Sequence, residues 1–285
     1  MSPTNTGHRL LLVHAHPDDE SIFTGATMAR YAAEGAQVTL VTCTMGERGG
    51  IAKSYPGPER EELPHMGEED RLTLVAKIRA RELQAACAAL GVTEQIYLGG
   101  AGQWRDSGVR PNHGARAFAL ADLDEAAEQL AAVIREAAPQ VIVTYDAKGF
   151  YEHPDHIQAH RVAWRAYELA CDPLRTKFYA LTIPRSVLAE ATGQGGPATA
   201  RVLQYGAADE EVTTKIEVDA YLGAKLEAMK AHATQITVDG PNFSVLGLVS
   251  LRAFGAEYYT LLSGPGTTTA GSLGHGHEED LFAGI

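Results

Sequence analysis

Cysteine is scarce in this chain, and long apolar runs are absent. The 285 residues include three cysteines without CxxC spacing, Cys43, Cys87 and Cys171. This scarcity excludes the disulfide framework of a small secreted protein and predicts reduced thiols in a cytoplasmic protein. No apolar run approaches the ~20 residues of a membrane span. We also expect no signal peptide, because residues 1–7 are polar and lack a basic segment followed by an apolar one.

Basic residues are also in short supply. Lysine and arginine number 24 against 36 aspartates and glutamates, which leaves a net charge of −12. An acidic protein is repelled by nucleic acid and by anionic lipid, so we expect neither nucleic acid nor a membrane as a partner. The hydrophobic fraction of 45% permits a full core. The length fits one large α/β domain, or one domain with a smaller appendage.

Residues 9–20 concentrate the chemistry of the chain. Leu10–Val13 is long enough for a buried strand and too short for a helix. The run ends in five polar side chains, His14, His16, Asp18, Asp19 and Glu20. Such groups are costly at the end of a buried strand unless a site uses them, and open α/β sheets build their sites at that end. A proline restricts this turn, so His16 and Asp19 can face one point with Asp18 beside them.

A second copy of this pattern follows Val141–Thr144, another apolar β-branched run. Residues 152–156 read Glu-His-Pro-Asp-His. One His-Pro-Asp is a common turn, but two copies at the ends of two predicted strands indicate a metal site. His16 and Asp19, with one histidine from the second turn, make a set that leaves a coordination position open, as in catalytic zinc centres. Ferrous iron accepts the same set, so the native metal stays open.

Strand and helix patterns alternate through most of the chain. We expect strands at 10–13, 37–42, 95–98, 141–144, 177–183 and 212–218, and helices at 21–34, 69–90, 121–138, 156–170 and 219–235. The first strand–helix–strand unit has a short crossover, which predicts a parallel sheet. It lacks GxGxxG, so little favours a dinucleotide site. We expect a catalytic core in residues 1–184. Residues 185–285 would complete the pocket and end in a glycine-rich tail from about residue 263.

The polar residues near the expected metal suit amide or ester hydrolysis. A zinc ion with an open position lowers the pKa of its water towards ~7, and a neighbouring carboxylate can take the proton of the attacking water. Of Asp18 and Asp19, one would bind the metal and the other would act as the base. A protonated His153 or the hydroxyl of Tyr151 would stabilise the oxyanion.

Substrate contacts are expected from one helix and two glycine-rich loops. Arg79 lies on the helix over 69–90, Glu47 in the loop 44–50 and Asp106 in the loop 99–108. Together they would hold a hydroxyl-rich substrate. The alternative is that Arg79 is an exposed helix charge and that both loops are ordinary solvated loops. We expect packing or support of the site from His160, packing or capping from His232, and surface positions for the tail histidines His275 and His277. The alternatives are that His160 is a ligand and that His232 lies at the edge of the site.

Residues 15–20, Ala-His-Pro-Asp-Asp-Glu, paired with His-Pro-Asp-His at 153–156, resemble the PIG-L/LmbE-like zinc N-deacetylases. The resemblance implies a Rossmann-like α/β fold and removal of acetyl from N-acetylglucosamine-type sugars. Four more stretches, 41–44, 97–102, 104–108 and 232–235, are similar to the branch of the family that acts on N-acetylglucosaminyl-inositol in mycothiol biosynthesis. An amino-sugar inositol is therefore the expected small-molecule substrate.

The resemblance also implies a role for each motif residue. It implies His16, Asp19 and His156 as zinc ligands, Asp18 as general base, His153 as electrostatic or general-acid partner, Tyr151 as a mobile oxyanion contact, and Arg79 and Asp106 as sugar and inositol contacts. Three alternatives stay open: a mycothiol S-conjugate amidase, a bacillithiol-type deacetylase acting on glucosaminyl malate, and a non-catalytic sugar- or metal-binding protein. The presence of Asp18 and His153 argues against the last, because a binding site needs neither base nor acid. The oligomeric state does not follow from the sequence.

Overall fold

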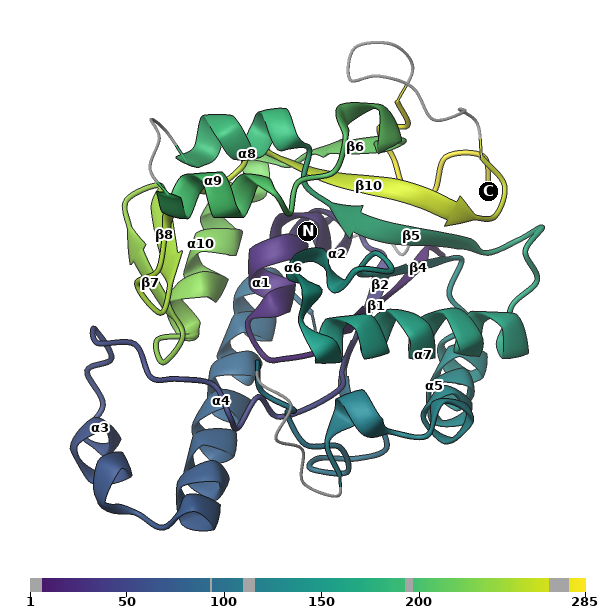
Figure 1. Cartoon of the computed structure of the whole chain (residues 1–285). Helices are drawn as coiled ribbons and strands as arrows, with labels where there is room; N and C mark the ends of the chain where they lie inside the picture. The colour runs from purple at the N-terminus through teal and green to yellow at the C-terminus, as the bar shows by residue number, and fades with distance from the viewer. Residues whose placement is uncertain (1–6, 93, 110–115, 193–196, 267–276) are drawn as a thin grey trace.

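The computed structural model describes residues 7–92, 94–109, 116–192, 197–266 and 277–285. A seven-stranded sheet runs through it in the order β3-β2-β1-β4-β5-β10-β6, with helices packed along it (Figure 1). Its strands are β1 (Arg9–His14), β2 (Gln37–Thr42), β3 (Glu94–Tyr97), β4 (Val141–Thr144), β5 (Lys177–Thr182), β6 (Thr214–Glu217) and β10 (Ala256–Ser263).

The helices connect the strands and cover the sheet. They are α1 (Asp19–Phe23), α2 (Gly25–Ala33), α3 (Glu59–Glu62), α4 (Glu68–Leu90), α5 (Leu123–Ala137), α6 (Gly149–Glu152), α7 (Pro154–Ala170), α8 (Arg185–Thr192), α9 (Pro197–Leu203) and α10 (Leu222–Ala231). Short 3₁₀ turns occupy Leu63–His65, Phe118–Leu120, Asp209–Glu211 and Asp219–Tyr221. Helices α5 and α7 pack on each other, while α10 packs on α4 and α2.

The topology places the site. Strands β1 to β5 pair in parallel, and only β10 runs antiparallel to its neighbours β5 and β6. The predicted α/β class with a mostly parallel sheet is therefore confirmed. Because β1 lies between β2 and β4, the chain leaves β1 towards one edge and later returns on its other side. The carboxyl ends of β1 and β4 thus flank the point where the strand order reverses, the usual ligand position in open α/β sheets.

The prediction of a single helix over 21–34 is wrong. The chain forms α1 and α2 instead, because Thr24 leaves the helical conformation with φ −134° and ψ 8°. The Thr24 hydroxyl lies 2.9 Å from His14 Nε2. The break also frees the amides of Ala26 and Thr27, which donate to the buried carboxylate of Glu257. Hydrogen bonds to side chains here replace continuous helical ones.

The helix predicted over 219–235 is too long. Helix α10 ends at Ala231, because the polar groups that follow bond to other segments. The amide and hydroxyl of Thr234 donate to Glu82 of α4, and Gln235 Nε2 donates to the Gly50 carbonyl. A backbone committed to such contacts cannot continue the helical ladder.

The region after residue 184 departs most from the sequence pattern. The strand predicted over 212–218 spans only Thr214–Glu217, and helices α8 and α9 were not expected. Neither was β10, nor the small antiparallel sheet of β7 (Ile236–Asp239), β8 (Asn242–Val245) and β9 (Ser250–Arg252). Strands of three or four residues show too little alternation to be recognised from the sequence.

Residues 277–285 return to the sheet. Glu278 accepts hydrogen bonds from Lys177 Nζ at 2.9 Å and from the Tyr179 hydroxyl at 2.6 Å. Lys177 is fully buried, so its charge depends on this carboxylate. Leu281 and Phe282 join the main core.

Other sequence expectations have mixed outcomes. The three cysteines are unpaired, as expected. No helix within the described ranges is long and apolar enough to cross a membrane. Most of the glycine-rich stretch, residues 267–276 with His275, lies outside the described residues.

Candidate metal and active site

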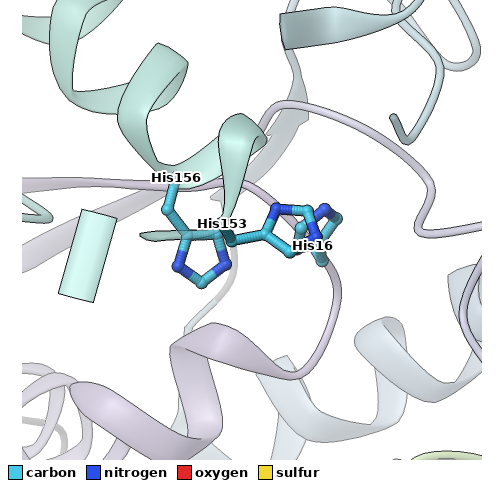
Figure 2. Close-up of side chains that lie close together, drawn as sticks. All are labelled: His16, His153 and His156. Carbon is cyan, nitrogen blue, oxygen red and sulfur yellow. The ribbon is translucent and has the colours of Figure 1, made fainter. Parts of the chain in front are cut away.

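Three imidazole rings meet at the carboxyl ends of β1 and β4. His16 lies in the turn after β1, whereas His153 and His156 lie at the start of α7, which follows β4 (Figure 2). One ring nitrogen from each histidine lies within 4.8 Å of the other two, and all three side chains are buried. The two His-Pro-Asp turns therefore converge on one point.

Asp19 lies between two of these histidines. Its Oδ2 atom is 3.3 Å from His16 Nδ1 and 3.3 Å from His156 Nε2. The same oxygen accepts the Tyr145 hydroxyl at 2.7 Å and the His16 amide at 2.9 Å. Burial alone would raise the pKa of Asp19, but the two imidazoles outweigh it and hold this pKa well below its ordinary value. Asp19 is thus an ionised carboxylate fixed beside two histidines.

His156 indicates that the group fits a metal ion. Both ring nitrogens of His156 are buried; Nδ1 has no partner in the described part of the chain, and Nε2 has only the 3.3 Å contact with Asp19 Oδ2. The ring stacks on Tyr145 with centroids 4.0 Å apart, which fixes its orientation. A buried imidazole nitrogen that makes no hydrogen bond is costly, and coordination of the ring to a divalent cation would reduce that cost. This histidine and aspartate group can therefore bind a metal.

The contact of Asp155 with His16 was not predicted from the sequence. Its Oδ2 atom lies 3.1 Å from His16 Nε2, and its two oxygens also accept the amide and hydroxyl of Ser107. A carboxylate on one ring nitrogen orients a metal-binding histidine and leaves the other nitrogen facing the metal. The only available signal was that Asp155 directly precedes His156. Tyr145, which donates to Asp19, was missed in the same way, although it directly follows β4.

Asp18 is held in an uncommon backbone conformation. Its φ is 124° and its ψ is −32°, a region that residues with side chains rarely occupy. Its Oδ2 lies 3.0 Å from Arg79 Nη2. Burial raises the pKa of Asp18 to about 7, although the Arg79 guanidinium opposes this shift. The carboxyl group is therefore adjacent to the metal group and able to change its protonation state near neutral pH.

Arg79 is buried against the first turn and does not project from α4 into solvent. Besides its contact with Asp18, it donates to the carbonyl groups of Pro17 and Gly46. Arg79 thus ties the first turn to the glycine-rich loop after β2, and its Nε is buried without a partner among the described residues.

Glu47 and Asp106 lie together on the glycine-rich loops. Glu47 Oε1 accepts the Asp106 amide at 3.2 Å, and Glu47 Oε2 is buried with no partner in the described residues. The Asp106 oxygens accept the amides of Gly108 at 2.8 Å and Arg48 at 3.1 Å, and Oδ1 lies 3.6 Å from His16 Nε2. Each carboxylate retains acceptor capacity, which suits a ligand rich in hydroxyl groups.

His153 and Tyr151 border the metal group on the α7 side. His153 Nδ1 accepts the Asp155 amide at 3.2 Å, so the proton of the neutral ring lies on Nε2. Tyr151 remains 36% exposed, and its ring centroid lies 4.9 Å from that of His156 and 5.7 Å from that of His153. The protonated His153 considered from the sequence is therefore not needed, because the neutral ring already carries a donor.

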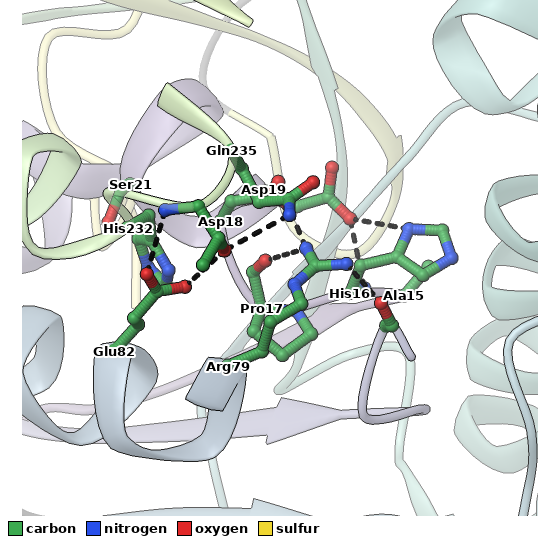
Figure 3. A network of polar contacts seen from close by, with 12 residues as sticks. Ala15, His16, Pro17, Asp18, Asp19, Ser21, Arg79, Glu82, His232 and Gln235 are labelled. Atoms are coloured by element: carbon green, nitrogen blue, oxygen red, sulfur yellow. Dashed lines mark hydrogen bonds and ion pairs between the residues drawn. The ribbon is translucent and has the colours of Figure 1, made fainter. Parts of the chain in front are cut away.

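Glu20 and His232 form a buried pair behind Asp18. His232 Nε2 lies 2.6 Å from Glu20 Oε1. Burial would lower the pKa of His232 and raise that of Glu20, but the attraction between the two groups reverses both shifts. Figure 3 shows His232 and Gln235 approaching the first turn from one side and Arg79 and Glu82 from another. His160 lies elsewhere, with Nδ1 2.8 Å from the Tyr145 carbonyl.

The match to a protein-family model identifies the family of this chain. A family model described as PIG-L, GlcNAc-PI de-N-acetylase, matches residues 11–167, which is more than half of the 285 residues and includes both His-Pro-Asp turns. The chain belongs to the PIG-L family. The predicted resemblance and the predicted class of enzyme, a deacetylase, are confirmed.

Within the PIG-L family, closely similar proteins share one name. A relative from Thermomonospora curvata, called 1D-myo-inositol 2-acetamido-2-deoxy-alpha-D-glucopyranoside deacetylase, is 50% identical over 305 residues. The alignment covers 99% of this chain and 98% of the relative. The similarity therefore extends well beyond the segment that carries the two turns.

Solved structures share the PIG-L fold at much lower identity. A deacetylase of the teicoplanin pathway, in complex with teicoplanin, has a TM-score of 0.56 and 17% identity, and the match covers 90% of this chain and 99% of that one. The 4-carboxy-2-hydroxymuconate hydratase of Pseudomonas putida also has a TM-score of 0.56, with 19% identity and coverage of 92% and 99%. Because one fold carries both reactions, the reaction must be argued from the site.

Proposed function

We propose that this protein hydrolyses the N-acetyl amide of N-acetylglucosaminyl-inositol, releasing acetate and glucosaminyl-inositol for mycothiol biosynthesis. The observation that carries the proposal is the position of Asp19 Oδ2, 3.3 Å from nitrogens of both His16 and His156, with Asp18 as the preceding residue. A metal group with a carboxylate beside it suits water attack on an amide. The name of the 50% identical relative supplies the sugar and the inositol.

The proposed metal ligands are His16, Asp19 and His156. Two observations support this set: Asp155 orients His16, and His156 Nε2 lies 3.3 Å from Asp19 with no hydrogen bond to either of its ring nitrogens. A set of His16, His153 and His156 is the competing one, because these three rings also converge. Zinc is the proposed metal, and ferrous iron suits the same ligands. A divalent cation at this position supplies Lewis acidity, which activates water and polarises a carbonyl.

Side chains of the protein carry out the proton transfers in this proposal. Asp18 takes a proton from water as the oxygen of that water attacks the carbonyl carbon. His153 Nε2–H and the Tyr151 hydroxyl donate to the carbonyl oxygen as it becomes negative. When the C–N bond breaks, the amine nitrogen takes the proton that Asp18 received from water, and acetate leaves. Arg79 holds the Asp18 carboxylate in the position that these proton transfers require.

Recognition of the sugar and inositol is proposed for Glu47, Asp106 and Arg79. The unpartnered Glu47 Oε2 and the free acceptor capacity of Asp106 suit vicinal hydroxyl groups, and the guanidinium of Arg79 would donate to a substrate oxygen. We further propose that residues 185–285 complete the pocket of a catalytic core in residues 1–184, and that the protein works in the cytoplasm, where its three thiols stay reduced.

A small substrate panel tests the proposal. N-acetylglucosaminyl-inositol, free N-acetylglucosamine and a mycothiol S-conjugate would be compared by mass spectrometry of the products. We expect the inositol glycoside to have the highest kcat/KM, because the free sugar lacks the inositol contacts that position the amide. Asp106→Ala should narrow this preference. Equal kcat/KM for the first two substrates would contradict inositol recognition, and a preference for the S-conjugate would assign the protein to the amidases.

A further inference from the structure

The conformation of Asp18 requires an explanation outside Asp18 itself. A residue with a side chain at φ 124° is strained, and such strain persists only when surrounding contacts hold it. Asp18 also directly precedes α1, and its side chain makes no capping hydrogen bond to that helix. The usual local stabilisation of a helix start is therefore missing at this residue.

Glu20 provides one of the contacts that hold this backbone. The Asp18 amide donates to Glu20 Oε2 at 2.8 Å, so the carboxylate two residues along the chain closes a tight loop on the strained residue. Its other oxygen, Oε1, accepts the Ser21 hydroxyl at 2.6 Å and faces His232 Nε2 at 2.6 Å. Glu20 and His232 are both fully buried, so neither has water as an alternative partner.

His232 is itself rigidly anchored. It follows α10 directly, and its carbonyl accepts the amides of Gln235 and Ile236 at 2.9 and 2.8 Å. Thr234 is bonded to Glu82 of α4 and Gln235 to Gly50 of the glycine-rich loop. The segment 232–235 therefore joins α10, α4 and the loop after β2, and it presents one imidazole nitrogen to Glu20.

We propose that His232 is a positioning residue, which acts through Glu20 to hold the backbone of Asp18 in the conformation that directs its carboxylate to the site. The kinetic part of this inference rests on the proposed role of Asp18 as the base. The geometry behind this proposal is that the His232 imidazole contacts Oε1 of the Glu20 carboxylate and the Asp18 amide donates to Oε2.

A second buried pair on the same helix provides a matched control. Lys225 of α10 lies 2.6 Å from Glu257 and is equally buried. Glu257 also accepts amides at the start of α2, from Ala26 and Thr27. This pair stabilises the packing of α10 without a hydrogen bond to Asp18. Lys225→Met therefore measures the loss of a buried charge on α10 without the loss of the Glu20 contact.

The test compares two amide side chains at position 232. Glutamine places its nitrogen near the position of the histidine Nε2, whereas asparagine is shorter and places it near Nδ1. We expect His232→Gln to keep kcat within about threefold and His232→Asn to lose roughly 10- to 100-fold in kcat, the cost expected from a misplaced catalytic group. KM and metal content should stay unchanged in both. Lys225→Met should lower Tm and leave kcat within about twofold.

Amide NMR gives a readout that needs no substrate. In the unmodified protein, the Asp18 amide proton should resonate downfield and exchange as slowly as core amides, because it donates to a buried carboxylate. His232→Asn should shift it upfield, whereas His232→Gln and Lys225→Met should not. A failure of the substrate panel leaves this readout intact, so the two proposals fail separately.

Three results would overturn the inference. The first is an Asp18 amide that exchanges as fast as a surface amide in the unmodified protein, which requires no variant to fold. The second is equal kcat for the glutamine and asparagine variants. The third is a kcat loss in His232→Asn that Lys225→Met reproduces, since that would reduce His232 to a packing residue.

Discussion

The turns after β1 and β4 both contain His-Pro-Asp, but their helices begin at different residues. After β1, α1 begins at Asp19, one residue beyond the tripeptide; after β4, α7 begins at the proline itself, Pro154. In the first turn Asp18 is therefore left outside the helix in a strained conformation beside Arg79. In the second turn Asp155 lies inside the first helical turn and faces His16.

This difference decides what each residue can do. The first histidine, His16, points into the metal group, while its counterpart His153 caps α7 by accepting the Asp155 amide. Only the fourth positions, Asp19 and His156, correspond, since both lie in the first turn of a helix and face each other at 3.3 Å. In identical tripeptides, the aspartate of one turn thus lies beside Arg79, where we propose that it acts as the base, and the aspartate of the other turn lies beside His16.

The largest expected effect is on metal binding, and it separates His16 and His156 from His153. Alanine at His16, Asp19 or His156 should remove the bound metal and abolish deacetylation, because each would lose one ligand of three. His153→Ala should keep the metal and lose only rate. Metal analysis of the purified variants checks this. Full occupancy in the Asp19 variant together with an empty His153 variant would assign the three-histidine set instead.

The next effect concerns the two aspartates of the tripeptides. Asp18→Asn should bind metal normally and lose ~10²–10⁴ in kcat, the range for a positioned general base. The base works only when deprotonated, so activity of the parent should fall as pH drops through the Asp18 pKa. That pKa is about 7 without a cation and moves lower beside one. An acidic limb that persists in an active Asp18→Asn enzyme would identify another base.

A smaller effect is expected from the second aspartate. Asp155→Asn keeps the size of the side chain but removes the negative charge beside His16 Nε2. Loss of a carboxylate that orients a metal-binding histidine typically costs 10–100-fold in metal affinity or activity. Titration with zinc in a competing chelator measures the affinity. An unchanged affinity and rate would show that Ser107 and the turn orient His16 without the charge.

The smallest effect concerns the proline that begins α7. Pro154 occupies the first helical turn and its fixed φ suits that position. Pro154→Ala should lower the free energy of unfolding by about 0.5–1 kcal/mol, because the unfolded chain gains freedom. Urea denaturation measures this change, and kcat/KM should stay within about twofold. A large rate loss would mean that the proline also fixes His153.

The residues at the metal group were predictable because strand ends and ligand types are local in sequence. His16, Asp19 and one histidine of the second turn follow from two short patterns at the ends of β1 and β4, and the choice of His156 came from the family resemblance. The contacts of Arg79 were not predictable in that way, since its partners include backbone carbonyls of Pro17 and Gly46 that leave no trace in residue type. Arg79 was expected to hold the substrate, and most of its donors are used within the protein.

The parallel strands β1 to β5 could likewise be predicted from the sequence, whereas β10 and the small antiparallel sheet could not. Strands β1 and β4 contain continuous apolar runs and β2 is rich in β-branched residues, as expected for buried parallel strands. Strand β10 pairs with β5, some 80 residues earlier in the chain, and such long-range pairing has no local signal. Side-chain pairs between residues far apart in the sequence, such as Glu20 with His232, were missed for the same reason.

The contact between Glu278 and Lys177 has a practical consequence for shortened forms of the protein. Removing residues 277–285 would leave the ammonium group of Lys177 buried without its carboxylate, a change that typically costs ~3–5 kcal/mol. That is a large part of the 5–15 kcal/mol that stabilises an ordinary domain. Deletions from the end should therefore stop short of Glu278.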